Sequence, residues 1–123
     1  MLKYAIVAVG ILASSSALAA EAKITLYYGQ PKSAEDFDKY YYEKHLPRVY
    51  AVKAIKKVEL SRPVPTPDGK PPATYLIIEM YFDSLEALRA EQATDEWKAL
   101  AADVPNYATG GATPTVSVIE PKR

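Results

Sequence analysis

The sequence contains no cysteine, and among its 123 residues it has one histidine and one tryptophan. Without cysteine the chain can form neither a disulfide nor a thiolate metal site, and it cannot carry a lipid on an N-terminal cysteine. A single histidine and scattered acidic residues offer no cluster of ligands, so we expect no metal site. The glycine pair Gly110-Gly111 lacks the lysine and the helix of a phosphate loop, and we expect no tightly bound cofactor.

An excess of positive charge is also missing. Fifteen lysines and arginines balance fifteen acidic residues, and the sequence has no extended basic segment. A surface that binds nucleic acid carries clustered positive charge to neutralise phosphates. We therefore expect no nucleic-acid partner.

No apolar run is long enough to cross a membrane. The longest, Tyr4 to Ala13, is about half of the roughly twenty residues that a spanning helix needs. Lys3 precedes it, and Ala17-Leu18-Ala19 has the small residues that a signal peptidase accepts. We predict a signal peptide over residues 1–19, cleaved after Ala19, and one mature domain over residues 20–123. The protein is then periplasmic or secreted, and not held in a membrane after cleavage.

The patterns of the mature chain predict four strands and two helical regions. A helix capped by Ser33 runs to Val52 and should break or kink near Leu46, because Pro47 lacks an amide donor. A second helical region, in two pieces, begins at Asp83 or Ser84 and again at Thr94 or Asp95. Between the middle strands, residues 62–72 hold five prolines and form a long hairpin loop. The strands are expected at 23–28, 54–60, 74–82 and 115–120.

This β-α-β-β-α-β order predicts a ferredoxin-like α+β sandwich, with a four-stranded antiparallel sheet and both helices on one face. The strand alternation places Tyr75, Ile77 and Tyr81 on the opposite face. An aromatic-rich face should not stay in water, so we expect a homodimer through the open sheet face. Glu79 would be a buried carboxylate there, with Arg48 or Arg62 as its partner. The face under the helices takes Ile24, Leu26, Leu76, Ile78, Met80 and Phe82.

Two segments carry a resemblance to a known family. The segment from Phe37 to Pro47, FDKYYYEKHLP, resembles the first-helix signature of the EthD family, and Asp103-Val104-Pro105-Asn106-Tyr107 is similar to that family's segment before the last strand. The resemblance implies a dimeric α/β barrel. It also implies small-molecule chemistry, because the family is associated with breakdown of ethyl tert-butyl ether and similar fungal proteins act on polyketide-type aromatics. Many members have no assigned reaction.

His45 is the first candidate for a functional residue, since no other side chain here has an ordinary pKa near neutrality. Tyr41 lies four residues earlier, on the same side of a helix, and could place a phenol beside the imidazole. We predict His45 and Tyr41 as catalytic residues. From the residues alone, a structural hydrogen-bonding role for His45 is the alternative. The resemblance implies that the matching histidine faces an internal cavity. Phe37, Tyr28 and Trp97 are the predicted substrate-binding residues.

Two classes of function fit these residues. The first is an exported protein that binds a small aromatic or ether-type molecule between the first helix and the sheet, in an accessory or binding role. The alternative is a cofactor-independent enzyme that degrades or modifies small molecules, with His45 as general base and Tyr41 polarising a carbonyl. Haem-binding members of the wider superfamily imply a third, His45 as an axial ligand.

Overall fold

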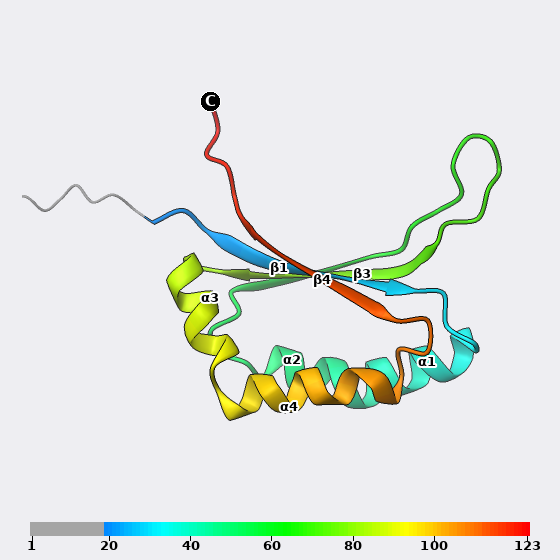
Figure 1. Ribbon diagram of the computed structural model, residues 1–123, viewed down its shortest axis with the longest axis horizontal. Coiled ribbons are helices and arrows are strands. Elements are labelled where there is room, and N and C mark those ends of the chain that lie inside the picture. Colours follow the sequence, from blue (N-terminus) through cyan, green and yellow to red (C-terminus); the bar gives the residue numbers. More distant parts are fainter. Residues whose placement is uncertain (1–18) are drawn as a thin grey trace, which may run out of the picture.

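The computed structural model describes residues 19–123, and most of the predicted signal peptide lies outside them. The described chain forms one sheet with helices beneath it (Figure 1). None of its helices is long and apolar enough to cross a membrane. The strands are β1 (Ala22–Gly29), β2 (Lys57–Ser61), β3 (Thr74–Phe82) and β4 (Ala112–Val118). The helices are α1 (Ala34–Tyr40), α2 (Leu46–Tyr50), α3 (Leu85–Gln92) and α4 (Asp95–Asp103), with a π-helical turn η2 (Tyr41–His45) and a 3₁₀ turn η3 (Val104–Asn106).

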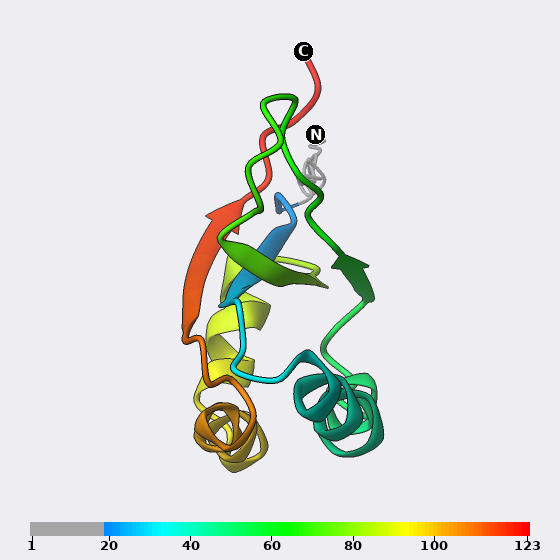
Figure 2. The same cartoon turned by 90° about the vertical axis from the view of Figure 1, so that its right-hand side faces the viewer.

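The sheet has the order β2-β3-β1-β4, and every neighbouring pair is antiparallel. All helices cover one face, with α4 beneath the β4 edge and α1 and α2 beneath the β2 edge (Figure 2). The expected ferredoxin-like order is therefore confirmed. The loop 62–73 and the C-terminal tail both extend past the opposite face (Figures 1 and 2).

Two strand boundaries were predicted wrongly. β2 begins at Lys57 rather than Ala54, because the chain after α2 turns first: the Val52 amide donates to the Val49 carbonyl and the Ile55 amide to the Val52 carbonyl. β4 occupies 112–118 rather than 115–120, since its pairing with β1 starts at Ala112 opposite Tyr28. Tertiary pairing thus extends β4 into a segment whose own composition reads as loop.

The helix starts follow their capping residues. Ser33 accepts the Asp36 amide, Ser84 the Ala87 amide and Thr94 the Trp97 amide, so each side chain satisfies one of the free amides of a first turn. The prediction for Ser33 is confirmed. For the other two helices the prediction left Asp83 or Ser84, and Thr94 or Asp95, as the cap. The caps are Ser84 and Thr94.

Of the two outcomes predicted near Leu46, a break does not occur, but the regular α-helix is interrupted directly before this residue. The chain stays helical from Ala34 to Tyr50 because it widens into η2 just before the proline, and the Leu46 amide donates to the Tyr41 carbonyl five residues back. A proline ring clashes with the carbonyl four residues earlier in a regular helix. The wider π turn relieves that clash, and it sets the direction of His45.

Close contact between glycines fixes the loop before β4. A Cβ on Gly29 would lie 2.3 Å from the Gly110 carbonyl oxygen, so neither residue could carry a side chain. The Gly29 amide donates to the Gly111 carbonyl at 3.0 Å, and Gly111 adopts a φ of 89°, which favours glycine. This contact holds Tyr107 against Tyr28. The hydroxyl oxygens of the two tyrosines are 2.6 Å apart.

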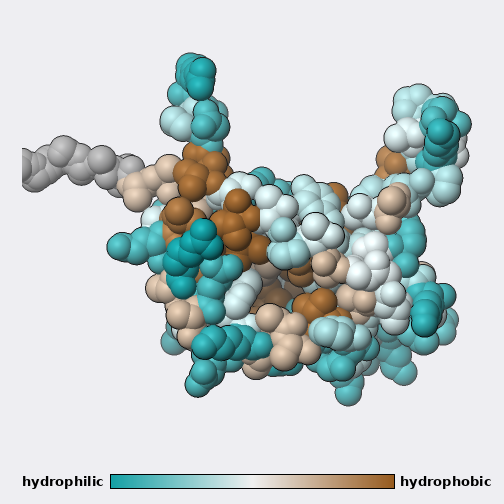
Figure 3. Space-filling view, viewed as in Figure 1, coloured by the Kyte–Doolittle hydropathy of each residue, from teal (hydrophilic) through white to brown (hydrophobic). Residues whose placement is uncertain are grey.

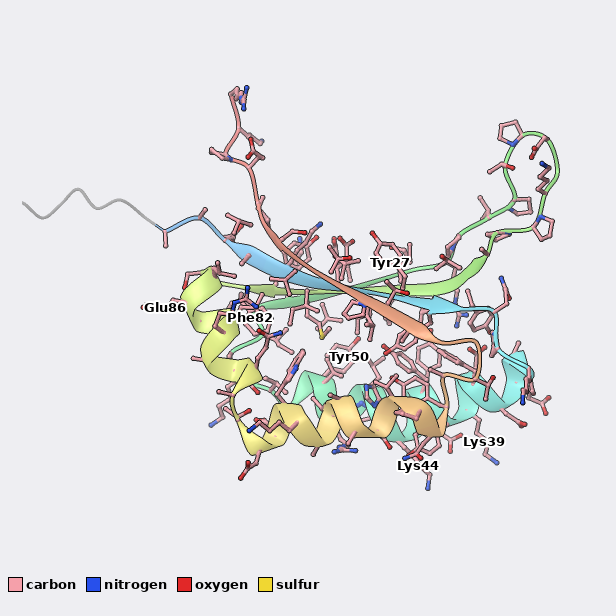
Figure 4. The ribbon with its side chains drawn as sticks, in the orientation of Figure 1. Tyr27, Lys39, Lys44, Tyr50, Phe82 and Glu86 are labelled. Atoms are coloured by element: carbon pink, nitrogen blue, oxygen red, sulfur yellow. The ribbon has the colours of Figure 1, made fainter. Side chains whose placement is uncertain are left out.

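The open face of the sheet differs from the expected aromatic face. Tyr75 turns toward α1, where its ring packs on Phe37 and its hydroxyl donates to Asp38 at 2.9 Å. This end of β3 lies opposite a register shift in β1 at Tyr28/Gly29, where the strict alternation of faces is lost. Glu79 does stay on the open face, but its partner is Lys23, at 2.6 Å, and neither predicted arginine. Tyr27 also projects from this face (Figure 4).

Candidate functional site

A cavity of about 330 Å³ lies between the sheet and the helices. The surface is hollowed between β4 and α4, and apolar side chains border the hollow (Figure 3). The lining comes from β1, β3 and β4 above and from η2, α2, α3, α4 and η3 below. The volume and the mostly apolar lining are typical of small-molecule sites. Its polar side chains are Tyr28, Tyr41, His45 and Gln92, and Trp97 also lines it.

His45 enters this cavity from the C-terminal end of η2. The residue is 4% exposed, and its Nδ1 lies 2.9 Å from Oδ2 of Asp103, at the end of α4. A carboxylate only accepts hydrogen bonds. Nδ1 therefore carries the proton and donates it to Asp103, and the lone pair is on Nε2. No partner for Nε2 is found within residues 19–123.

Asp103 is held by donors on both oxygens. Oδ1 accepts the Tyr40 hydroxyl at 2.6 Å and the Asn106 side-chain amide at 2.9 Å, while Oδ2 faces His45 and, at 3.6 Å, Arg48. Burial alone would raise the pKa of this carboxyl, but the hydrogen bonds from Tyr40, His45 and Asn106 outweigh it and bring the pKa to about 2. Asp103 is thus an anion at neutral pH, in a fixed orientation.

Burial lowers the pKa of His45 below its ordinary value of 6.5, and the nearby Arg48 lowers it further, while the hydrogen bond and the charge of Asp103 act in the opposite direction. The net effect is a neutral imidazole at neutral pH. Such a ring can accept a proton at Nε2, and the Asp103 carboxylate would stabilise the cation that forms. This is the arrangement of a general base with an orienting acid.

Tyr41 lies beside His45, with the two rings stacked at 5.4 Å and an interplanar angle of 24°. The residue is fully buried, and its hydroxyl is the one buried side-chain polar atom of residues 19–123 without a hydrogen-bond partner. Burial raises the pKa of this phenol, followed by the charge and the nearby hydroxyl of Tyr28, which does not reach hydrogen-bond geometry, so the Tyr41 hydroxyl stays protonated. Leaving a buried donor unpaired costs about 1 to 3 kcal/mol. A ligand that displaces the side chains enclosing this hydroxyl and offers it an acceptor would remove that cost.

Comparisons with known proteins place the chain in a family. Residues 29–111 match the model of the EthD domain. The chain belongs to the EthD family. An uncharacterised 11.0 kDa protein of Rhodococcus erythropolis is 33% identical over 91 residues, which cover 74% of this chain and 87% of that protein. The crystal structure of an EthD family protein from Bacillus halodurans superposes with a TM-score of 0.75 at 29% identity, over 81% of this chain and 99% of that one.

A more distant likeness concerns the fold alone. A cofactor-independent oxygenase from Streptomyces nogalater superposes with a TM-score of 0.61 at 10% identity, over 85% of this chain and 97% of the other. The family match confirms the resemblance to EthD proteins that the first-helix sequence showed. The superposed structures confirm the predicted fold class, that of the ferredoxin-like dimeric α/β-barrel proteins.

Four of the five predicted site residues line the cavity. Tyr41 and His45 line it, as do Tyr28 and Trp97. Phe37 does not. Its ring lies behind the cavity wall, within 5.3 to 5.4 Å of the rings of Tyr28, Tyr41 and Tyr107, and supports those side chains instead of contacting a ligand.

Sequence reasoning missed Asp103 and Asn106 as parts of the site, although both lie in the segment that resembles EthD proteins. One signal was present. Asp103 ends α4, where the helix dipole disfavours an anion, so an acid there needs another reason. Gln92 carried no such signal. Within residues 19–123 no group of three or more histidines and acids is placed to hold a metal ion.

Proposed function

We propose that this EthD protein is a cofactor-independent enzyme that removes a proton from a carbon next to a carbonyl group in a small apolar molecule. The contact between His45 and Asp103 at the cavity carries the proposal, because it supplies the orienting acid that a lone histidine would lack. The same fold houses cofactor-independent chemistry in the Streptomyces oxygenase.

The proposed step balances without any added reagent. Nε2 of His45 takes the proton from the carbon, the electrons of the broken C–H bond form the C=C bond of an enolate, and the carbonyl oxygen becomes negative. The free hydroxyl of Tyr41 would donate to that oxygen, and Asp103 would stabilise the imidazolium. Apolar walls keep water from competing for these charges.

Hydrogen exchange tests this step without knowledge of the natural substrate. The probe is 2-tetralone, an apolar bicyclic ketone with acidic hydrogens beside its carbonyl. In D₂O the protein should replace those hydrogens by deuterium faster than buffer alone, as followed by proton NMR. Exchange at the buffer rate, with the probe shown to bind, would reject the proposed chemistry.

Tyr41→Phe should separate activity from stability. Loss of a donor to the developing enolate lowers rates by about 10² to 10³. Because the Tyr41 hydroxyl has no partner, removing it should leave the free energy of unfolding unchanged or raise it by about 1 kcal/mol. Tyr28→Phe is the matched control, since it breaks the contact with Tyr107 and should destabilise the protein by about 1 kcal/mol. NMR exchange and urea unfolding measure the two effects, and a Tyr41→Phe protein with full activity contradicts the assigned role.

A binding role without turnover is the second candidate, favoured by the largely apolar lining of the cavity. A carrier or sensor would hold the molecule and release it unchanged. Native mass spectrometry of protein taken from its own host would identify such a ligand. A bound ketone that keeps its hydrogens in D₂O for hours would favour this role over the enzyme.

We further propose that two copies pair through their open sheet faces, as expected for a dimeric α/β barrel. The charges there are already paired within one chain, Lys23 with Glu79 and Lys57 with Glu59, so two such faces can meet without leaving unpaired charges.

Ile77→Asp would add an unpaired carboxylate to this face, and we expect it to weaken the dimer at least about tenfold, or roughly 1.4 kcal/mol. Lys44→Asp is the control, because Lys44 is exposed on the helix side and points away from the sheet (Figure 4). Sedimentation velocity at micromolar concentration would report both. A wild-type monomer contradicts the pairing.

Export remains a proposal on the sequence of residues 1–19. We expect mature protein from a bacterial host to begin at Ala20. N-terminal sequencing of the periplasmic fraction measures this, and a chain that still begins at Met1 contradicts it.

A further inference from the structure

The polar groups of the cavity are found at two ends. Tyr41 and His45 lie at the end where Asp103 closes α4, and Gln92 lies at the other end, two residues before the Thr94 cap of α4. The nine residues of α4 span about 13 Å at 1.5 Å per residue. The two polar ends are therefore separated by about the length of that helix.

The wall between the two ends is apolar. Its apolar side chains include Trp97 and Leu100 below, and Leu26, Ile78, Met80 and Val116 above. No lysine, arginine, aspartate or glutamate lines the cavity. A charged molecule would lose its hydration here without gaining a partner, which is costly. An uncharged ligand with an apolar middle fits this wall.

The amide of Gln92 is oriented by its neighbour. Its Oε1 accepts from Nη1 of Arg89 at 3.2 Å, and this contact assigns the oxygen to the arginine and leaves Nε2 as the free donor. No acceptor for Nε2 is found in the described part of the chain. Gln92 therefore offers the cavity a hydrogen-bond donor that a ligand could use.

We propose that Gln92 forms a second recognition site, which binds an ether or carbonyl oxygen at the far end of an elongated, uncharged ligand. The proposal rests on the proposed function, since the near end of the same ligand presents its carbonyl to Tyr41 and His45. The ligand class is thus an extended apolar ketone with a hydrogen-bond acceptor at the opposite end. A small ketone would occupy only the near end.

The only tryptophan of the chain makes a direct test possible, because Trp97 lines the cavity between the two ends. Two probes of equal length are titrated while Trp97 fluorescence is followed: 4-acetyl-4′-methoxybiphenyl, which has the distal oxygen, and 4-acetyl-4′-ethylbiphenyl, which lacks it. One neutral hydrogen bond should make the methoxy probe bind about fivefold more tightly to the wild type.

Gln92→Leu keeps the shape of the side chain without the donor, and it should remove this preference. Tyr41→Phe, changed at the other end, should weaken both probes and keep the preference. Equal affinity of the two probes for the wild type, or a preference that survives Gln92→Leu, overturns the distal site. The exchange of 2-tetralone by the wild type, which needs no distal oxygen, reports separately on the proposed function. If neither biphenyl probe binds, the elongated ligand class is wrong.

Discussion

His45→Gln is expected to lower the rate of deuterium exchange into 2-tetralone by about 10² to 10⁴, the usual contribution of a general base. Glutamine can still donate to Asp103 from its amide, so the buried carboxylate keeps a partner and the fold should persist. It offers no basic nitrogen to the cavity. Proton NMR measures the rate, and circular dichroism checks the fold.

A structural role for His45 gives the reverse result. The variant would then lose about 1 to 3 kcal/mol of stability through the changed contact with Asp103, while any exchange activity of the folded fraction would remain. Lys44→Gln, next in the chain but pointing away from the sheet (Figure 4), is the control and should change neither property.

Asp103→Asn should reduce exchange by about 10³ to 10⁴, because the amide group turns a donor toward Nδ1 of His45 and shifts the proton to Nε2, the wrong tautomer for a base. Asp103 is thus a positioning residue. Loss of its charge also weakens the hydrogen bonds from Tyr40 and Asn106, and we expect the free energy of unfolding to fall by about 2 to 4 kcal/mol.

The pH dependence separates positioning from plain stabilisation. The pKa of Asp103 is about 2 in the folded protein and higher when unfolded, so its contribution to stability is present above pH 4 and lost as the pH falls toward 2. Asp103→Asn should flatten this part of the stability curve. The residual exchange should also fail at a lower pH than in the wild type, since the carboxylate raises the pKa of His45. An unchanged acid limb of the rate profile contradicts the coupling.

The fold could be predicted from local patterns because β3 alternates strictly and the caps Ser33, Ser84 and Thr94 begin the helices where the sequence places them. The errors have a common cause in long-range contacts. β4 extends because β1 pairs with it, and Tyr75 leaves the open face because α1 offers Asp38 and Phe37.

The candidate site was only half visible for the same reason. Tyr41 and His45 are four residues apart and could be related through one helix, whereas Asp103 is 58 residues from His45 and meets it only after both helices pack under the sheet. The free hydroxyl of Tyr41 is invisible to sequence patterns, since it depends on every neighbour that fails to pair with it.

The π turn η2 determines the direction in which the residues after it face. One extra residue in a turn rotates everything downstream by about 100° relative to a continuous α-helix. If the same residues formed a continuous α-helix instead, His45 and Leu46 would be rotated by up to about that angle and the imidazole would leave its position beside Asp103, with every side chain preserved. Relatives could lose or regain this placement of the histidine through the loss or gain of the π turn alone, which a comparison of residue identities at aligned positions would not register.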